Sequence, residues 1–214
     1  PINKKNLKVG TNFKFSGHTD YLAYLCGVKW AVMMLTCPEL KVVPLTIHIP
    51  IRDVPKAITK EVFEITVKII HSGLIKDFGI KNPRILVAGL NPHASEGGSI
   101  GTEDIDHIEP WVSDLRSQGI SISGPSSADT MFHKRARGDY DVALCMYHDQ
   151  ALIPIKTIDF FGGANVTLGL PIVRTSPDHG TAFDIAGKGI ANEKSMVHAI
   201  RTANLIINSR RNEA

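Results

Sequence analysis

Short apolar runs alternate with amphipathic stretches along most of this chain. Apolar runs typical of β-strands lie at residues 32–35, 41–48, 84–90, 120–123, 141–147, 165–168 and 172–175. Apolar residues at helical spacing, or helix-start signals, predict helices from Asp53, from Thr102, over 126–133 and from Asn192 towards Asn208. Because strands alternate with helices, we predict an α/β fold with a mostly parallel sheet.

Three of the predicted helices have a clear apolar face. The helix after Asp53 has its apolar face at Ile58, Val62, Ile65, Ile69 and Ile70. The helix after Thr102 has Ile105, Ile108, Val112 and Leu115 on its apolar stripe. The last helix has an apolar face of Val197, Ile200, Ala203 and Ile207, with Leu205 to one side.

Composition limits the classes of protein to which the chain can belong. The 214 residues, 43% of them hydrophobic, suffice for one large domain or two small ones. The net charge of +3 is too small to favour nucleic-acid binding. No run approaches the ~18 apolar residues that a membrane helix needs. Cys26, Cys37 and Cys145 lack metal-type spacing and are typical of a reducing compartment. We therefore predict a cytoplasmic protein that binds neither nucleic acid nor membrane.

Three histidines come at or just after the ends of predicted strands. His48 closes one strand, His93 follows another after two residues, and His148 directly follows a third. In an open α/β sheet the carboxyl ends of parallel strands share one edge, where ligands bind. Three imidazoles at that edge could hold a divalent metal and leave a coordination position open. A hydrogen-bonded structural role for each histidine is the alternative.

Several charged and polar residues are further candidates for chemistry. Asp129 and Asp149 could orient metal ligands or accept protons, and surface or capping roles are their alternatives. Lys156 and Arg174 are natural anion ligands, and Asn165 can join them, although their spacing alone does not bring them together.

Three loop motifs carry weaker signals. The segment 15–20 contains His18 and Thr19, which could bind a phosphate or carboxylate or could form a turn into a helix. The segment 91–98 is glycine-rich and permits close backbone approach to a ligand. The segment 178–192 contains neither the Rossmann nor the Walker A glycine pattern.

Four motifs together resemble one enzyme family. They are Gly17-His18-Thr19, Asn91-Pro92-His93-Ala94, Tyr147-His148-Asp149-Gln150 and Asp178-His179-Gly180-Thr181-Ala182. In this order they resemble the 4-hydroxythreonine-4-phosphate dehydrogenase family, a branch of the isocitrate and isopropylmalate dehydrogenase fold. The stretch 179–192 is similar to the adenosine-binding loop of that fold, and the resemblance covers nearly the whole chain.

The resemblance implies a reaction. It implies oxidation of 4-phosphohydroxy-L-threonine with NAD, then loss of carbon dioxide to give 3-amino-2-oxopropyl phosphate in pyridoxal phosphate biosynthesis. A divalent metal, Zn, Mg or Co, would assist, and NADP is the alternative cofactor. The other readings are a related dehydrogenase of D-threonate or D-erythronate 4-phosphate, a metal-dependent phosphohydrolase, or an inactive fragment.

The resemblance also implies roles for individual residues. The metal ligands would be His48, His93 and His148. The substrate would contact His18, Thr19, Lys156, Asn165 and Arg174. The cofactor would contact His179, Gly180, Thr181, Ala182, Asp184 and Asn192. The candidates for acid or base catalysis are Lys156, Asp149 and Asp129. A carboxylate at Asp184, facing the ribose, would favour NAD because it repels a 2′-phosphate.

The implied architecture is a two-lobed α/β/α fold with one lobe incomplete. Residues 20–155 would form a central lobe that binds metal and dimerises. Residues 1–19 and 156–214 would form the remainder of the cofactor-binding lobe, because family members have a further segment before residue 1. We expect a homodimer with its active site at the interface.

Overall fold

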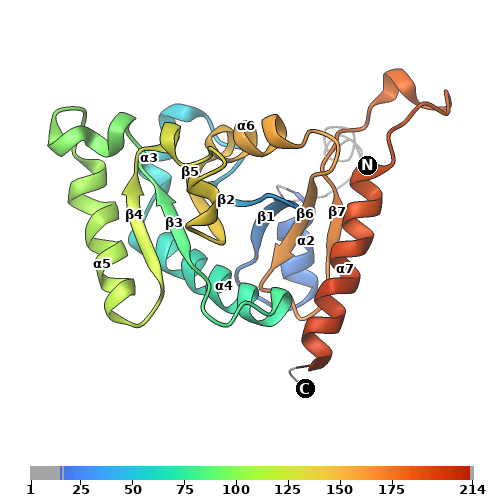
Figure 1. Cartoon of the computed structure of the whole chain (residues 1–214), viewed down its shortest axis with the longest axis horizontal. Helices are drawn as coiled ribbons and strands as arrows, with labels where there is room; N and C mark the ends of the chain where they lie inside the picture. Colours follow the sequence, from blue (N-terminus) through green and yellow to red (C-terminus); the bar gives the residue numbers. More distant parts are fainter. Residues whose placement is uncertain (1–14, 16, 213–214) are drawn as a thin grey trace.

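The chain folds around one mixed sheet. The computed structural model describes residues 15 and 17–212. Its strands are β1 (Val32–Cys37), β2 (Leu40–Thr46), β3 (Ile85–Ala88), β4 (Ile122–Ser126), β5 (Val142–Tyr147), β6 (Ala164–Leu168) and β7 (Thr175–Pro177). They lie in the order β4-β3-β5-β2-β1-β6-β7, with β4 at one side of the molecule and β7 at the other (Figure 1).

Helices and short helical turns connect the strands. The helices are α2 (His18–Leu25), α3 (Val54–Ala57), α4 (Lys60–Phe78), α5 (Glu109–Ser117), α6 (His148–Ile158) and α7 (Lys194–Asn212). The short turns are η1 (Ile51–Asp53), η2 (Pro92–Gly98), η3 (Asp104–Ile108), η4 (Ala128–Thr130), η5 (Ala136–Gly138) and η6 (Phe183–Ile185). No helix in the part of the chain that the structure describes is long and apolar enough to cross a membrane.

The sheet has two halves with different strand directions. In the parallel half, β4, β3, β5 and β2 all run the same way. In the antiparallel half, β1 runs against both β2 and β6, and β7 runs against β6. The prediction of a mostly parallel sheet is therefore wrong for the second half. Only Pro38 and Glu39 separate β1 from β2, and so short a connection makes a hairpin and cannot make a parallel crossover.

Two hydrophobic cores lie on the two faces of the sheet. Neighbouring strand residues point to opposite faces, so Val43 joins one core while Val42 joins the other. The first core contains α4 residues such as Phe63, together with residues of α5 and α7. The second core contains Ala151 and Ile155 of α6. The sheet therefore has helices on both faces, as an α/β/α arrangement requires.

Several predicted elements need correction. The helix predicted from Asp53 is two helices, because Thr59 is extended and caps α4 by accepting a hydrogen bond from the Val62 amide at 3.3 Å. The helix predicted over 126–133 is the single turn η4, since β4 continues to Ser126. The strand predicted over 172–175 is displaced to Thr175–Pro177. Helix α6 was not predicted, and α2 was expected only as the helix to which a turn at 15–20 could lead.

Helix α7 packs through a face that the apolar pattern did not identify. Its buried residues are Ser195, Ala199, Thr202 and Ile206. The apolar face read from the sequence points outward, with Ile200 62% exposed and Met196 beside it 49% exposed. Small side chains on the buried face let α7 pack closely against the sheet. Figure 1 shows α7 beside β7. Burial of α7 therefore follows side-chain size more than hydrophobicity.

The sheet continues across the boundary predicted near residue 155. Strand β6 pairs with β1, and β7 pairs with β6, so residues 164–177 extend a sheet that begins before that boundary. The division into lobes stays a prediction. Most of its segment 1–19 lies outside the described residues.

Candidate active site

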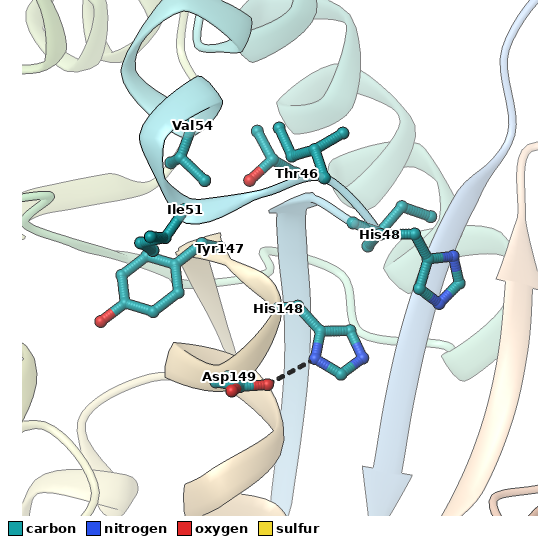
Figure 2. A pocket seen from close by; sticks show the side chains of 9 residues that line it. Thr46, His48, Ile51, Val54, Tyr147, His148 and Asp149 are labelled. Carbon is teal, nitrogen blue, oxygen red and sulfur yellow. Dashed lines mark hydrogen bonds and ion pairs between the residues drawn. The ribbon is translucent and has the colours of Figure 1, made fainter.

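His48 and His148 lie together at the carboxyl ends of β2 and β5. These strands pair in parallel, with Thr46 opposite Tyr147, so the residues that follow them emerge side by side. The centroids of the two imidazole rings are 5.7 Å apart. Both rings border a cavity of about 370 Å³. Ile51 and Tyr147 also line this cavity, and their side chains point away from the two rings (Figure 2). The sequence predicted this meeting of two histidines at one edge.

Asp149 fixes the orientation of the His148 ring. Its Oδ1 lies 2.6 Å from His148 Nδ1, as the dashed line in Figure 2 marks. When Nδ1 donates to this carboxylate, Nε2 carries a lone pair that can coordinate a metal. This contact is the orienting arrangement that the sequence suggested for Asp149.

His93 lies in a different loop with an unusual backbone. After β3, residues 93–97 all have positive φ, and His93 itself has φ 53° and ψ 29°. His48 also has φ 53°. Each non-glycine residue in this region costs on the order of 1–2 kcal/mol, and such strain clusters at functional sites. The surrounding contacts must therefore hold both histidines in place.

Asp129 is the acidic neighbour of His93. The Ser127 hydroxyl donates to Asp129 Oδ1 at 2.5 Å, and this hydrogen bond lowers the pKa of the carboxyl group. The charge of His93 lowers the same pKa further. The candidate residues thus form two groups, one with His48, His148 and Asp149 and one with His93 and Asp129.

The two groups do not form one metal centre within a single chain. Among residues 15 and 17–212, no three His, Cys, Asp or Glu side chains lie close enough to hold a metal ion. His48 and His148 nevertheless suit a divalent metal, because they are imidazoles with one ring oriented by a carboxylate. The predicted set is therefore brought together only in part.

A second cavity gathers four of the five predicted substrate residues. His18 and Thr19 from the start of α2 line it, together with Asn165, Arg174 and His48. Its volume is about 350 Å³. Because His48 borders both cavities, the predicted substrate residues and the histidine pair line adjoining cavities.

Arg174 is a half-buried cation in this cavity. Its Nη1 donates to Asn165 Oδ1 at 3.2 Å and to Thr167 Oγ1 at 3.0 Å. Burial lowers the pKa of the guanidinium from its usual value. Among the ion pairs of the described residues, none neutralises Arg174. A desolvated cation held by neutral acceptors is a site for a substrate anion.

Lys156, the fifth predicted substrate residue, has a different partner. Its Nζ lies 2.8 Å from Asp178 Oδ2, and it donates to the Asp178 carbonyl at 3.2 Å. Lys156 does not line the cavity around Arg174. It joins the end of α6 to the start of the predicted cofactor loop.

The predicted cofactor residues lie in one exposed loop between β7 and α7. His179, Gly180, Ala182, Asp184 and Asn192 are exposed, and Thr181 is half-buried. Asn192 Oδ1 accepts a hydrogen bond from the Lys194 amide, so it also contacts the first residue of α7. Ala182 has φ 46°, a further left-handed residue at a candidate site.

Comparison with known proteins identifies the family. A sequence model described as "Pyridoxal phosphate biosynthetic protein PdxA" matches residues 1–203. The chain belongs to the PdxA family. This result confirms the family resemblance of the sequence motifs and, with the solved structures below, the α/β class.

Named relatives of the PdxA family agree with this assignment. The chain is 59% identical over 204 residues to a 4-hydroxythreonine-4-phosphate dehydrogenase of Roseobacter denitrificans, covering 95% of the chain and 63% of that protein. A crystal structure of the Klebsiella pneumoniae enzyme of that name matches with TM-score 0.84 and 40% identity, covering 96% of the chain and 62% of that protein. This chain thus spans less than two thirds of their length.

A more distant structure shows that related folds carry other names. A terephthalate 1,2-cis-dihydrodiol dehydrogenase of Burkholderia xenovorans matches with TM-score 0.71 and 31% identity, over 89% of this chain and 61% of that one. The substrate in its name is not a phosphate ester. Fold similarity therefore does not define the substrate of this PdxA-family chain.

Two residues that support the candidate site of this PdxA-family chain, Gln150 and Asp104, were not predicted to do so. Gln150 accepts from the Met146 amide at 2.7 Å and donates to the Gly89 carbonyl at 2.8 Å, which links the ends of β5 and β3. Asp104 is wholly buried beside the His93 loop. Gln150 belongs to the motif at 147–150 and could have been found through it. Asp104 had no signal beyond its place near the start of a predicted helix.

Proposed function

We propose that this protein oxidises 4-phosphohydroxy-L-threonine with NAD and a divalent metal and releases carbon dioxide to give 3-amino-2-oxopropyl phosphate. The reaction would belong to pyridoxal phosphate biosynthesis. The observation that supports it most is the cavity in which Arg174, without an anionic partner among the described residues, lies with His18, Thr19 and His48. Cytoplasmic location stays a prediction.

Arg174 would bind an anionic group of the substrate. Both of its hydrogen bonds to Asn165 and Thr167 use Nη1, so these neutral acceptors orient the guanidinium without cancelling its charge. His18 and Thr19 line the same cavity and would contact the rest of the substrate. A planar guanidinium suits phosphate or carboxylate recognition.

His48 and His148 would hold the metal. Asp149 keeps His148 Nε2 available, and its own Oδ2 is the oxygen that His148 does not engage. A bound divalent ion would supply Lewis-acid polarisation of the substrate alcohol and carbonyl oxygens. Asp149 Oδ2 and Asp129 are the candidates for accepting the alcohol proton, whereas Lys156 would first have to give up the proton of the ammonium group that pairs with Asp178.

We infer that His93 completes the metal site in a homodimer with its active site at the interface. Within the described residues of one chain, the three histidines do not form a group that could hold a metal ion. Ile49 and Ile51, next to His48, are 39% and 68% exposed, so a partner could bury apolar surface beside the site. Zn, Mg and Co remain the metals proposed.

NAD would bind the loop at 178–192. Asp184 is exposed there, as a residue that meets a ribose must be in the free protein. A carboxylate at that position favours NAD, and NADP is the alternative. The Lys156–Asp178 ion pair anchors the first residue of the loop.

NADH formation tests the proposal. The purified protein is mixed with NAD, a divalent metal and 4-phosphohydroxy-L-threonine, and absorbance of NADH is followed with and without a chelator. We expect a chelator-sensitive rise. No rise would contradict the proposal, faster turnover of D-threonate or D-erythronate 4-phosphate would change its substrate, and phosphate release without NAD would indicate a phosphohydrolase.

A further inference from the structure

The loop that carries His93 is held by a buried carboxylate. Asp104 and Ser95 are both 0% exposed. Asp104 Oδ1 accepts from the Leu90 amide at 2.7 Å, and Oδ2 accepts from the Asn91 amide at 3.0 Å and from the Ser95 hydroxyl at 2.8 Å. All three contacts are donors to the carboxylate, and they lie on both sides of His93.

A second set of contacts surrounds this carboxylate. The Asn91 amide group donates to Ser95 Oγ at 3.1 Å and to Glu103 Oε2 at 2.8 Å. Gly89 has no Cβ, and a Cβ there would come within 2.8 Å of the Ala94 backbone. The loop is therefore packed against β3 as well as hydrogen-bonded to Asp104.

These contacts explain how the left-handed residues 93–97 can persist. The chain must leave β3 and turn sharply, and the Leu90 and Asn91 amides find no strand partner there. A carboxylate supplies acceptors on both oxygens, whereas an amide side chain supplies only one oxygen and would turn an NH₂ group towards a donor. Asp104 therefore needs both of its oxygens as acceptors. One accepts from the Leu90 amide, and the other accepts from the Asn91 amide and the Ser95 hydroxyl.

We propose that Asp104 is a positioning residue for His93, a role that rests on the proposed metal-binding function. It does not touch the metal or the substrate. It sets the backbone of 90–95 so that the imidazole of His93 is presented at the carboxyl end of β3. Outer contacts of this kind change metal affinity although they supply no ligand.

Cobalt titration of Asp104→Asn tests this role. Co²⁺ binding is followed by its visible absorption in the wild-type chain and in each variant. We expect Asp104→Asn to weaken binding by about 10–100-fold, the usual effect of removing an outer-shell partner. His93→Ala should weaken it more.

Asp141→Asn is the matched control. Asp141 also accepts from a backbone amide, that of Arg84 at 2.8 Å, and from two guanidinium nitrogens, but it lies at the opposite ends of the parallel strands. We expect it to lower thermal stability and leave Co²⁺ affinity unchanged. A role of Asp104 in stability alone would make the two variants alike in this assay.

Amide hydrogen exchange at residues 90–98 separates the two proposals. If His93→Ala loses cobalt but Asp104→Asn binds as wild type, the positioning role is overturned. If His93→Ala binds as wild type, the metal role of His93 is overturned instead. In that case Asp104→Asn must still speed exchange at Leu90 and Asn91 without speeding it in β5, and unchanged exchange would overturn the positioning role.

Discussion

The two halves of the sheet hold their functional residues in different ways. In the parallel half, the loops at the strand ends are held by hydrogen bonds that Asp104 accepts from the His93 loop and by the hydrogen bond that Gln150 donates to the Gly89 carbonyl. In the antiparallel half, Arg174 has two neutral partners, and the loop at 178–192 is mostly exposed.

This difference shows which part of the site is organised before ligands bind. On the histidine side, Asp149 orients the His148 ring, and contacts with the buried Asp104 hold the left-handed loop of His93. The loop predicted to bind the cofactor is held by the Lys156–Asp178 pair and by the packing of α7. Changes in the antiparallel half should therefore act first on stability and substrate binding, and changes in the parallel half on metal binding.

The largest effect is expected where α7 joins α4. Arg210 contacts both carboxylate oxygens of Asp77 at 2.6 and 3.2 Å, and their side chains are only 16% and 3% exposed. Arg210→Met should lower the free energy of unfolding by about 3–5 kcal/mol, because it leaves a buried charge without its partner. Urea unfolding measures this. Arg211→Met is the control and should stay within about 0.5 kcal/mol, since Arg211 is exposed.

The face of α7 that packs can be tested with two isoleucines. Ile206 is 1% exposed and Ile200 is 62% exposed. Ile206→Ala should cost about 2–5 kcal/mol through the cavity it leaves, and Ile200→Ala should change stability by about 0.5 kcal/mol or less. Equal losses in thermal or urea unfolding would mean that the apolar face read from the sequence is buried after all.

Substrate binding should depend on Arg174. Hydrogen bonds to charged groups contribute about 1.5–3 kcal/mol, so Arg174→Met should weaken binding of 4-phosphohydroxy-L-threonine by roughly 10–150-fold. Calorimetric titration measures the dissociation constant. Arg201→Met, on the exposed side of α7, serves as the control and should bind as the wild type does. Retained affinity in Arg174→Met would place the anion site elsewhere.

A smaller effect is expected at the opposite ends of the parallel strands. Burial raises the pKa of Asp141, but hydrogen bonds from Arg84 outweigh it and leave the pKa below its usual value. The folded pKa is thus lower than the unfolded one, so this stabilisation is complete above about pH 4 and is lost as pH falls through the folded pKa. Asp141→Asn should reduce the acid sensitivity of unfolding below about pH 4. If the pH dependence of unfolding were the same in Asp141→Asn as in the wild type, Asp141 would not be a source of the acid sensitivity.

The motifs of the candidate site could be predicted from the sequence, but most of the residues that contact them could not. The sequence predicted that His48, His93 and His148 would meet, because the ends of parallel strands share an edge, and the structure brings the rings of His48 and His148 together. It did not predict the left-handed loop that carries His93, because the hydrogen bonds of that loop to Asp104 join residues 9 to 14 positions apart. It also predicted the buried face of α7 from hydrophobicity. In the structure the buried face consists largely of the small residues Ser195, Ala199 and Thr202, which allow close packing.

The parallel half of the sheet was easier to predict than the antiparallel half, and the reason is physical. Long apolar strands such as β5 show their burial in sequence, whereas the two-residue turn at Pro38 and Glu39 sets strand direction with little signal. The partner of Lys156 could not be predicted from sequence either. Its ion pair with Asp178 depends on how α6 lies relative to the loop after β7.

Cobalt titration of histidine variants tests the central claim most directly, namely that the strand-end histidines bind a divalent metal. We predict that His48→Ala and His148→Ala each lose Co²⁺ binding, whereas His179→Ala, in the proposed cofactor loop, binds Co²⁺ as the wild type does. Wild-type affinity in His48→Ala and His148→Ala, or loss of binding in His179→Ala, would contradict this assignment of the metal site.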